Sequence, residues 1–186
     1  MSKKKLLKIL KNTSTWNDLE KALTDSQENI NKLFEVFVKY YFLSAPSVKG
    51  DYKNAWLYDE IPNDIKKKLS LKPFKDYVSL LLENKKGEFT IVKCIFKTNY
   101  DGTNIDNEIK NINQLPTIVF TNIENLKINL SDKVSIIGKS ALQELSKVSL
   151  ASISSYLKSD PEASQKNFRQ SIAIYKYSWK AIKLVW

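Results

Sequence analysis

The chain has 186 residues and contains no histidine and a single cysteine. Histidine serves in the common zinc sites and in every Ser-His or Cys-His catalytic arrangement, so its absence excludes both. Cys94 has no second cysteine to pair with, which excludes an intrachain disulfide. Any chemistry must therefore use carboxylates, lysines and a hard metal ion such as Mg²⁺.

Long apolar runs are missing as well. The longest ones, at residues 77–82 and 91–96, are far shorter than the roughly 20 residues of a membrane-spanning helix. The apolar stretch that follows the lysine-rich start is broken by Lys8 and Lys11. The start therefore lacks the long apolar region of a signal peptide, and it also lacks the small-residue cleavage site. We therefore expect a soluble intracellular protein without a membrane span, located in the cytoplasm or nucleus, or in a virion if the source is viral.

The residues that are present suffice for a hydrophobic core and give a strong positive charge. Apolar residues make up 42% of the chain and glycine and proline are sparse, which predicts one folded domain with appended helices. The net charge of +10 favours an anionic partner such as nucleic acid or an anionic membrane surface. The lysine bias of an AT-rich bacterial, plasmid or viral genome would give the same excess. Because Arg169 is the only arginine, sequence-specific base reading is not favoured.

Apolar periodicity and turn residues predict strands that alternate with helices. This order predicts an α/β fold in which helices flank a mixed central sheet. We expect an N-terminal helical extension over residues 1–25, a core over 26–158 and a C-terminal amphipathic helix over 159–186. The expected helices cover 16–23, 27–43 (opened by a cap at Asp25), 64–69, 103–112 and 140–157, and the expected strands cover 54–61, 77–83, 88–97, 117–120 and 134–137.

The C-terminal residues predict a helix with two distinct stripes. Its aromatic-aliphatic stripe consists of Phe168, Ile172, Tyr175, Trp179, Ile182 and Trp186. A neighbouring basic stripe consists of Arg169, Lys176, Lys180 and Lys183. Three interpretations stay open: a helix docked on the core with solvated lysines, a basic helix lying on phosphates, or a helix that pairs with a protein partner, a second copy or a membrane surface.

Several short strings of the core occur in a recognisable order. Residues 33–41 carry a Phe34-Glu35 pair, residues 53–62 carry Trp56-Leu57, and a hairpin over 76–96 precedes the strands at 117–122 and 134–137. This order resembles the Mrr-like branch of the PD-(D/E)XK superfamily, the nuclease-type domain at the N-terminus of large restriction and helicase proteins. The resemblance covers about residues 16–148. It implies a restriction-endonuclease-like core with extra helices at both ends.

The resemblance also indicates where a nuclease site would lie. In that family an Asp at the end of the first hairpin strand and a Glu or Gln on the second strand hold Mg²⁺, and a Lys two residues further stabilises developing charge. The matching positions here are Ser79, Lys93 and Ile95, while Glu35 on the preceding helix is retained. These departures predict a degenerate site without conventional hydrolysis, without a bound metal and without a cofactor.

Two rearrangements could restore part of the site. Asp76 could supply a displaced carboxylate, although an offset of three on a strand points to the opposite face. Lys97 could replace the missing lysine, because Lys93 and Lys97 flank Ile95 on one face. A register error of one residue would exchange the faces entirely. Mg²⁺ becomes relevant only if such a rearranged site exists.

A further cluster of lysines lies at Lys66, Lys67 and Lys68. Such a run is usually a solvated helix face, but it could follow phosphates if it shared a side of the domain with Lys93 and Lys97.

Three functions stay in competition. The leading one is a catalytically inactive nuclease-like module that binds nucleic acid without sequence preference, with DNA favoured, or that supports a larger nucleic-acid-processing assembly. The second is a scaffold protein that assembles through its C-terminal helix. The third is a metal-dependent DNA endonuclease with a rearranged site.

Overall fold

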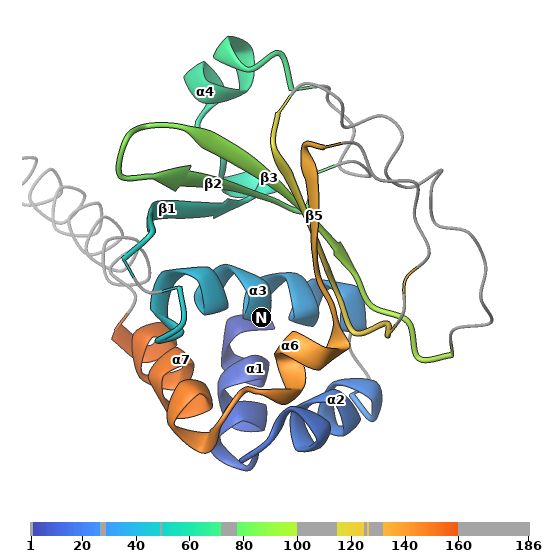
Figure 1. The fold of residues 1–186 in the computed structure, drawn as a ribbon. Helices are drawn as coiled ribbons and strands as arrows, with labels where there is room; N and C mark the ends of the chain where they lie inside the picture. Colours follow the sequence, from blue (N-terminus) through green and yellow to red (C-terminus); the bar gives the residue numbers. More distant parts are fainter. Residues whose placement is uncertain are drawn as a thin grey trace, which may run out of the picture.

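The computed structural model describes residues 2–26, 29–48, 50–71, 78–99, 115–124, 126 and 132–159 (Figure 1). Its helices are α1 (Ser2–Lys11), α2 (Trp16–Thr24), α3 (Ile30–Ser44), the short 3-10 helix η1 (Tyr58–Glu60), α4 (Asn63–Lys68), α6 (Lys139–Gln143) and α7 (Lys147–Ser159). Its strands are β1 (Tyr52–Leu57), β2 (Leu80–Asn84), β3 (Phe89–Ile95), β4 (Thr117–Thr121) and β5 (Val134–Ile137).

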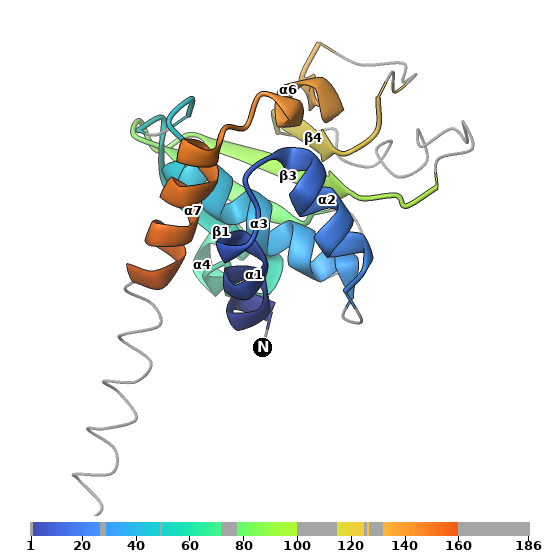
Figure 2. The same ribbon diagram turned by 90° about the horizontal axis from the view of Figure 1, so that it is seen from below.

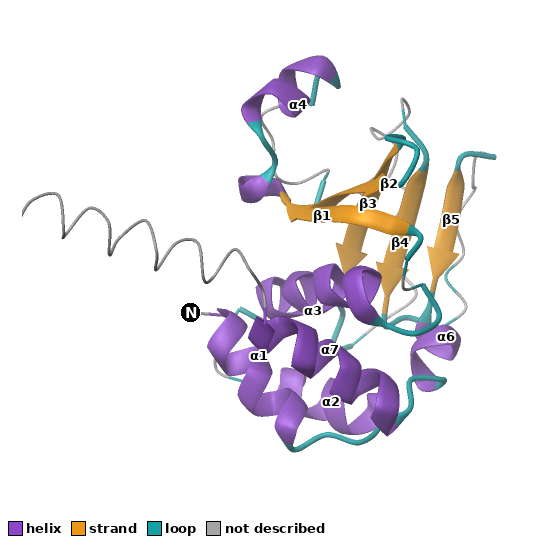
Figure 3. Ribbon diagram, turned by 90° about the vertical axis from the view of Figure 1, so that its left-hand side faces the viewer, coloured by secondary structure: helices purple, strands orange, loops and turns teal. Residues whose placement is uncertain are grey.

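The strands form one mixed sheet in the order β1-β2-β3-β4-β5. β1, β2 and β3 pair antiparallel, whereas β3, β4 and β5 pair parallel. Helices α1, α2, α3 and α7 lie on one side of this sheet and α4 lies on the other (Figures 1 and 3). The α/β class that the sequence predicts, with helices flanking a mixed sheet, is therefore confirmed.

The β2–β3 hairpin turns where the sequence predicts a turn. The side-chain oxygen of Asn84 accepts the backbone N–H groups of Lys86 at 2.9 Å and Glu88 at 3.0 Å. Gly87 has φ +80°, a conformation that L side chains rarely adopt. Asparagine and glycine therefore fix the loop length, and with it the register in which Leu80 pairs with Val92.

A helical-side cluster, which includes Leu33, Phe34, Phe37, Leu80, Val92, Phe96 and Phe120, fills the space between the sheet and the large helices. α3 is buried on nearly every side, which matches its continuous apolar sequence. Trp16 of α2 and Phe120 of β4 both contact Phe34, with ring centroids 6.3 Å and 5.8 Å apart. α1 and α2 thus contribute to the same core as α3, and no helix in the described ranges is long and apolar enough to cross a membrane.

An α4-side cluster covers the other face of the sheet. It consists of Ile61, Val78, Leu81, Ile91, Ile95, Val119 and Ile123. Ile65 and Leu69, from α4 and the residue after it, pack against this cluster. Among the described residues, the short helix α4 is the one α-helix that lies on this face (Figure 3).

Two helix boundaries differ from the prediction. α3 begins at Ile30, where the Asn29 side chain accepts the Lys32 N–H at 3.1 Å. Asp25, which the pattern assigned as the opening cap, instead ends α2. Asparagine and aspartate are equally good capping residues, so local sequence could not choose between them.

The single helix expected over 140–157 is two helices, α6 and α7. The Ser146 hydroxyl accepts the Ser149 N–H at 3.3 Å, which caps a new first turn. The expected strand over 54–61 likewise ends at Leu57 and continues as η1. The helix expected over 103–112 lies outside the described residues, as does the helix expected over 159–186 apart from Ser159, which ends α7.

Candidate functional site

The candidate site lies where β2 begins beside β3, and Ser79 is its structural centre. Ser79 is buried and all its polar groups are bonded. Its N–H donates to the Val92 carbonyl at 3.0 Å, and its own carbonyl accepts the Tyr58 N–H at 3.1 Å. The Ser79 hydroxyl accepts the Cys94 N–H at 3.1 Å. The hydroxyl thus takes the place in the ladder that a backbone carbonyl would normally fill.

Lys93 and Ile95 lie on the α4 side of β3. Ile91 and Ile95 belong to the α4-side cluster, whereas Val92 and Phe96 belong to the helical-side cluster. Alternation along the strand therefore places Lys93 with Ile95, as the sequence pattern predicts. Ile95 is only 3% exposed, so this position is part of the core.

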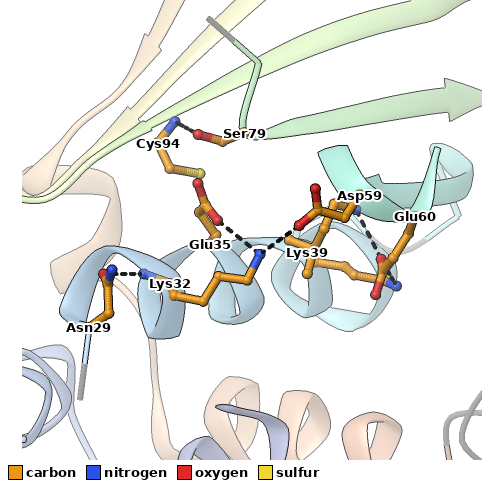
Figure 4. Close-up of polar contacts among 9 residues, drawn as sticks. Asn29, Lys32, Glu35, Lys39, Asp59, Glu60, Ser79 and Cys94 are labelled. Atoms are coloured by element: carbon orange, nitrogen blue, oxygen red, sulfur yellow. Dashed lines mark hydrogen bonds and ion pairs between the residues drawn. The ribbon is translucent and has the colours of Figure 1, made fainter. Parts of the chain in front are cut away.

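Glu35 lies on the opposite side of the sheet from these two residues. Its carboxylate extends from α3 towards the thiol of Cys94, which alternates with Lys93 and Ile95 along β3 (Figure 4). The structure therefore brings Glu35 close to Cys94 and Ser79 and separates it from Ile95.

A charge cluster that the sequence pattern did not reveal surrounds Glu35 (Figure 4). Lys32 Nζ lies 3.4 Å from a Glu35 oxygen and 3.9 Å from an Asp59 oxygen. Lys39 Nζ lies 2.7 Å from a Glu60 oxygen, and Lys39 is only 3% exposed. Lys32, Glu35 and Lys39 share one face of α3 because they are spaced three and four residues apart. The spacing of these three residues was the available sequence signal for a charge cluster. The acidic partners Asp59 and Glu60, however, come from η1, which the sequence pattern did not predict.

The thiol of Cys94 is kept protonated. Burial raises its pKa well above the ordinary value of 9.0, and the Glu35 carboxylate raises this pKa further. The Ser79 hydroxyl and the charge of Lys93 act in the opposite direction but are smaller effects. A thiol rather than a thiolate is a weak nucleophile, so Cys94 is not suited to covalent chemistry.

The donor atoms at this site do not suit Mg²⁺, which prefers carboxylate and carbonyl oxygens. The three positions that the sequence resemblance indicated offer a hydroxyl already bonded in the ladder, an ammonium group and an alkyl side chain. The nearby carboxylates of Glu35 and Asp59 contact Lys32. In the part of the chain that the structure describes, no three His, Cys, Asp or Glu side chains gather to hold a metal. Asp76 lies outside the described residues.

The lysines of α4 share a sheet face with Lys93. Lys66 Nζ lies 4.6 Å from the centroid of the Tyr58 ring, and Lys68 Nζ lies 5.9 Å from that of Phe89. Aromatic faces attract cations and hold the stems of these side chains against the α4-side cluster. Lys67 is exposed. The sequence-based interpretation needs this run to share a side of the domain with both Lys93 and Lys97, and of these two only Lys93 lies on the α4 side.

Lys97 lies elsewhere, in a depression of about 380 Å³ between α2 and the ends of β3 and β4. Asn122 holds the backbone of Lys97 by accepting its N–H and donating to its carbonyl, both at 2.9 Å. The Glu20 carboxylate accepts a hydrogen bond from Asn122 Nδ2 at 2.9 Å and forms an ion pair with Lys139 at 3.1 Å. Lys97 is therefore separated from the α4 lysines. The basic and aromatic stripes at 168–186 lie outside the described residues.

Comparison with known proteins shows that this chain is similar in fold to part of a solved structure. No family model and no curated protein matches the chain. A solved structure, the ATP-dependent Type ISP restriction-modification enzyme LlaBIII bound to DNA, is similar with a TM-score of 0.50 and 23% sequence identity. The match covers 71% of this chain and 8% of that enzyme. A small part of a restriction-modification enzyme therefore shares this α/β arrangement.

Proposed function

We propose that this chain is a nucleic-acid-binding module built on a PD-(D/E)XK-type core that does not hydrolyse its ligand. The observation that carries the proposal is the gathering of lysines on one sheet face. Lys66, Lys67 and Lys68 of α4 share this face with Lys93, and Lys66 lies over the ring of Tyr58, whose N–H donates to the Ser79 carbonyl. Ammonium groups at this place favour a phosphate backbone.

The loss of hydrolysis is supported by what the three family positions now do. The Ser79 hydroxyl is bonded to the Cys94 N–H, and Ile95 is packed in the α4-side cluster. Lys93 brings a positive charge to a position where a metal ligand would be needed. Phosphodiester hydrolysis of this type requires a metal-activated water, and these side chains do not supply its ligands.

DNA is the favoured ligand because the similar restriction-modification enzyme was solved bound to DNA. Binding should be independent of sequence, since lysine is a point charge that neutralises phosphates without reading base edges. Sequence-independent binding of this kind has a Kd on the order of 10⁻⁴ to 10⁻⁶ M and weakens steeply as salt rises.

The test is a titration of fluorescent duplex DNA with the full chain between about 50 and about 200 mM salt. Replacing Lys66, Lys67 and Lys68 with glutamine should reduce the slope of log K against log salt by about 2.7, or about 0.9 for each phosphate that is no longer neutralised. A control that removes the same charge replaces the exposed Lys53, Lys85 and Lys86 with glutamine. Absence of binding at low salt, or equal effects of both variants, would contradict this site.

The nuclease alternative is tested with supercoiled plasmid and Mg²⁺ or Mn²⁺. We expect no cleavage by the full chain. Cleavage that the substitution Glu35→Ala abolishes would show that the proposal of an inactive module is wrong and that a rearranged metal site exists.

A further inference from the structure

The helix α1 presents a face that the proposed α4 site does not use. Five of its ten residues are lysine, and it contains no acidic residue. All of its apolar side chains, Leu6, Leu7, Ile9 and Leu10, pack on the helical-side cluster. The charged groups that α1 offers to solvent are therefore all positive.

The outward lysines of α1 form a regular row. Lys4, Lys8 and Lys11 are exposed and lie four and three residues apart, which places them on one side of the helix. They span about 10 Å along the axis, which corresponds to about three phosphates of one DNA strand. None of these three takes part in an ion pair between described residues. Lys3 differs, because its Nζ reaches over the Tyr40 ring at 5.5 Å.

The charged side chains of the neighbouring helix α7 are also all positive. α1 packs against α7, and the two helices lie side by side in Figures 1 and 2. α7 has exposed lysines at Lys147 and Lys158 and no carboxylate. We define the α1–α7 lysine surface by these two residues and the row Lys4, Lys8 and Lys11.

A polyanion suits this surface better than a membrane. Interfacial helices bind lipid by burying an apolar face among the acyl chains, and the apolar face of α1 is already packed against the core. The remaining interaction is charge attraction to closely spaced phosphates, which a nucleic-acid backbone presents in a fixed row.

The surface lies on the opposite side of the molecule from α4. α3 and the sheet separate the two sets of lysines (Figures 1 and 3). We propose that the α1–α7 lysine surface is a second nucleic-acid site, so that one chain holds two separate segments at once. This inference rests on the proposed function, because it takes the α4 side as the first site.

The experiment measures whether the full chain joins two duplexes. One duplex is immobilised, and a second, fluorescent duplex is added with the protein at about 50 mM salt. The unchanged chain should retain the fluorescent duplex. The variant Lys4→Gln, Lys8→Gln, Lys11→Gln should lose this retention and still bind the immobilised duplex. Glutamine is a good helix former, and circular dichroism checks that α1 persists.

Each contrary result has a distinct meaning. The triple variant at Lys53, Lys85 and Lys86 removes the same charge and should retain bridging. If the α1 variant bridges as well as the unchanged chain, the second site is refuted while DNA binding stands. Two associated copies, each bound to one duplex through its α4 lysines, would then account for the bridging. If no variant binds any duplex, the proposed function itself fails.

A parallel arm uses vesicles of mixed phosphatidylserine and phosphatidylcholine. We expect the α1 substitutions to change duplex bridging and to leave vesicle binding within twofold. If they abolish vesicle binding and leave bridging intact, the surface serves a membrane and the inference is overturned.

Discussion

Replacing Ser79 with alanine should destabilise the protein by about 2 kcal/mol. The hydroxyl of Ser79 accepts the Cys94 N–H at 3.1 Å, and Ser79 is 5% exposed. Alanine removes the acceptor but leaves the donor inside the sheet, and an unsatisfied buried polar group costs about 1 to 3 kcal/mol. The removal of one small oxygen adds little to this, since no large cavity forms.

A matched control separates this effect from the general cost of a buried serine. Ser44 is also buried, and its hydroxyl donates to the Tyr40 carbonyl at 2.6 Å. That carbonyl keeps its helical partner when Ser44 is replaced with alanine, and alanine favours helix, so the change should cost under about 0.5 kcal/mol.

Urea unfolding gives the two free energies, and amide hydrogen exchange reports the Cys94 N–H directly. We expect Ser79→Ala to lower the Tm by about 4 to 8 °C, taking about 2 to 4 °C per kcal/mol for a chain of this size. Protection of the Cys94 amide should fall with it, and Ser79→Thr should keep that protection. If Ser79→Ala and Ser44→Ala cost the same and the Cys94 amide stays protected, the structural role of the hydroxyl is wrong.

Two further predictions concern the charge cluster and the thiol. Glu60→Ala should cost about 3 kcal/mol, because it removes a carboxylate that pairs with buried Lys39 and accepts the Leu57 N–H. Lys39→Met should cost about 1 kcal/mol, since the partly exposed Glu60 can be hydrated. Equal costs in urea unfolding would contradict this asymmetry. The raised pKa of Cys94 means that the folded state holds its proton more tightly than the unfolded state. The stability that this bound proton contributes is fully present below the ordinary thiol pKa of 9.0 and falls as the pH rises above that value. Unfolding curves at increasing pH should show this alkaline loss of stability in the unchanged chain and a smaller one in Cys94→Ala.

The local parts of this fold were predictable from the sequence. The hairpin follows from two apolar runs around Asn84 and Gly87, whose turn preferences depend on nearby residues alone. The helix α2 and the strands β4 and β5 follow in the same way from spacing. The break between α6 and α7 was missed because Ser146 reads equally well as an interior helical residue or as a cap.

The site was less predictable because it depends on which helix covers which sheet face. Strand alternation correctly places Lys93 and Ile95 together. It does not reveal that α3 packs on the other face, where Glu35 meets Cys94. The pairing of Lys39 with Glu60 joins residues 21 positions apart and requires η1 to follow β1. Such contacts are set by tertiary packing, which periodicity does not encode.

The same packing explains why Ser79 and Ile95 suit their surroundings. A lysine at position 95 would place an ammonium group among Leu81, Ile91 and Val119, where an unpaired charge is costly. An aspartate at position 79 would keep an acceptor for the Cys94 N–H but add a second negative charge near Glu35. A charged side chain at either position would therefore require its neighbours to change as well. Ser79 and Ile95 are therefore fitted to the hairpin and to the α4-side cluster that surround them.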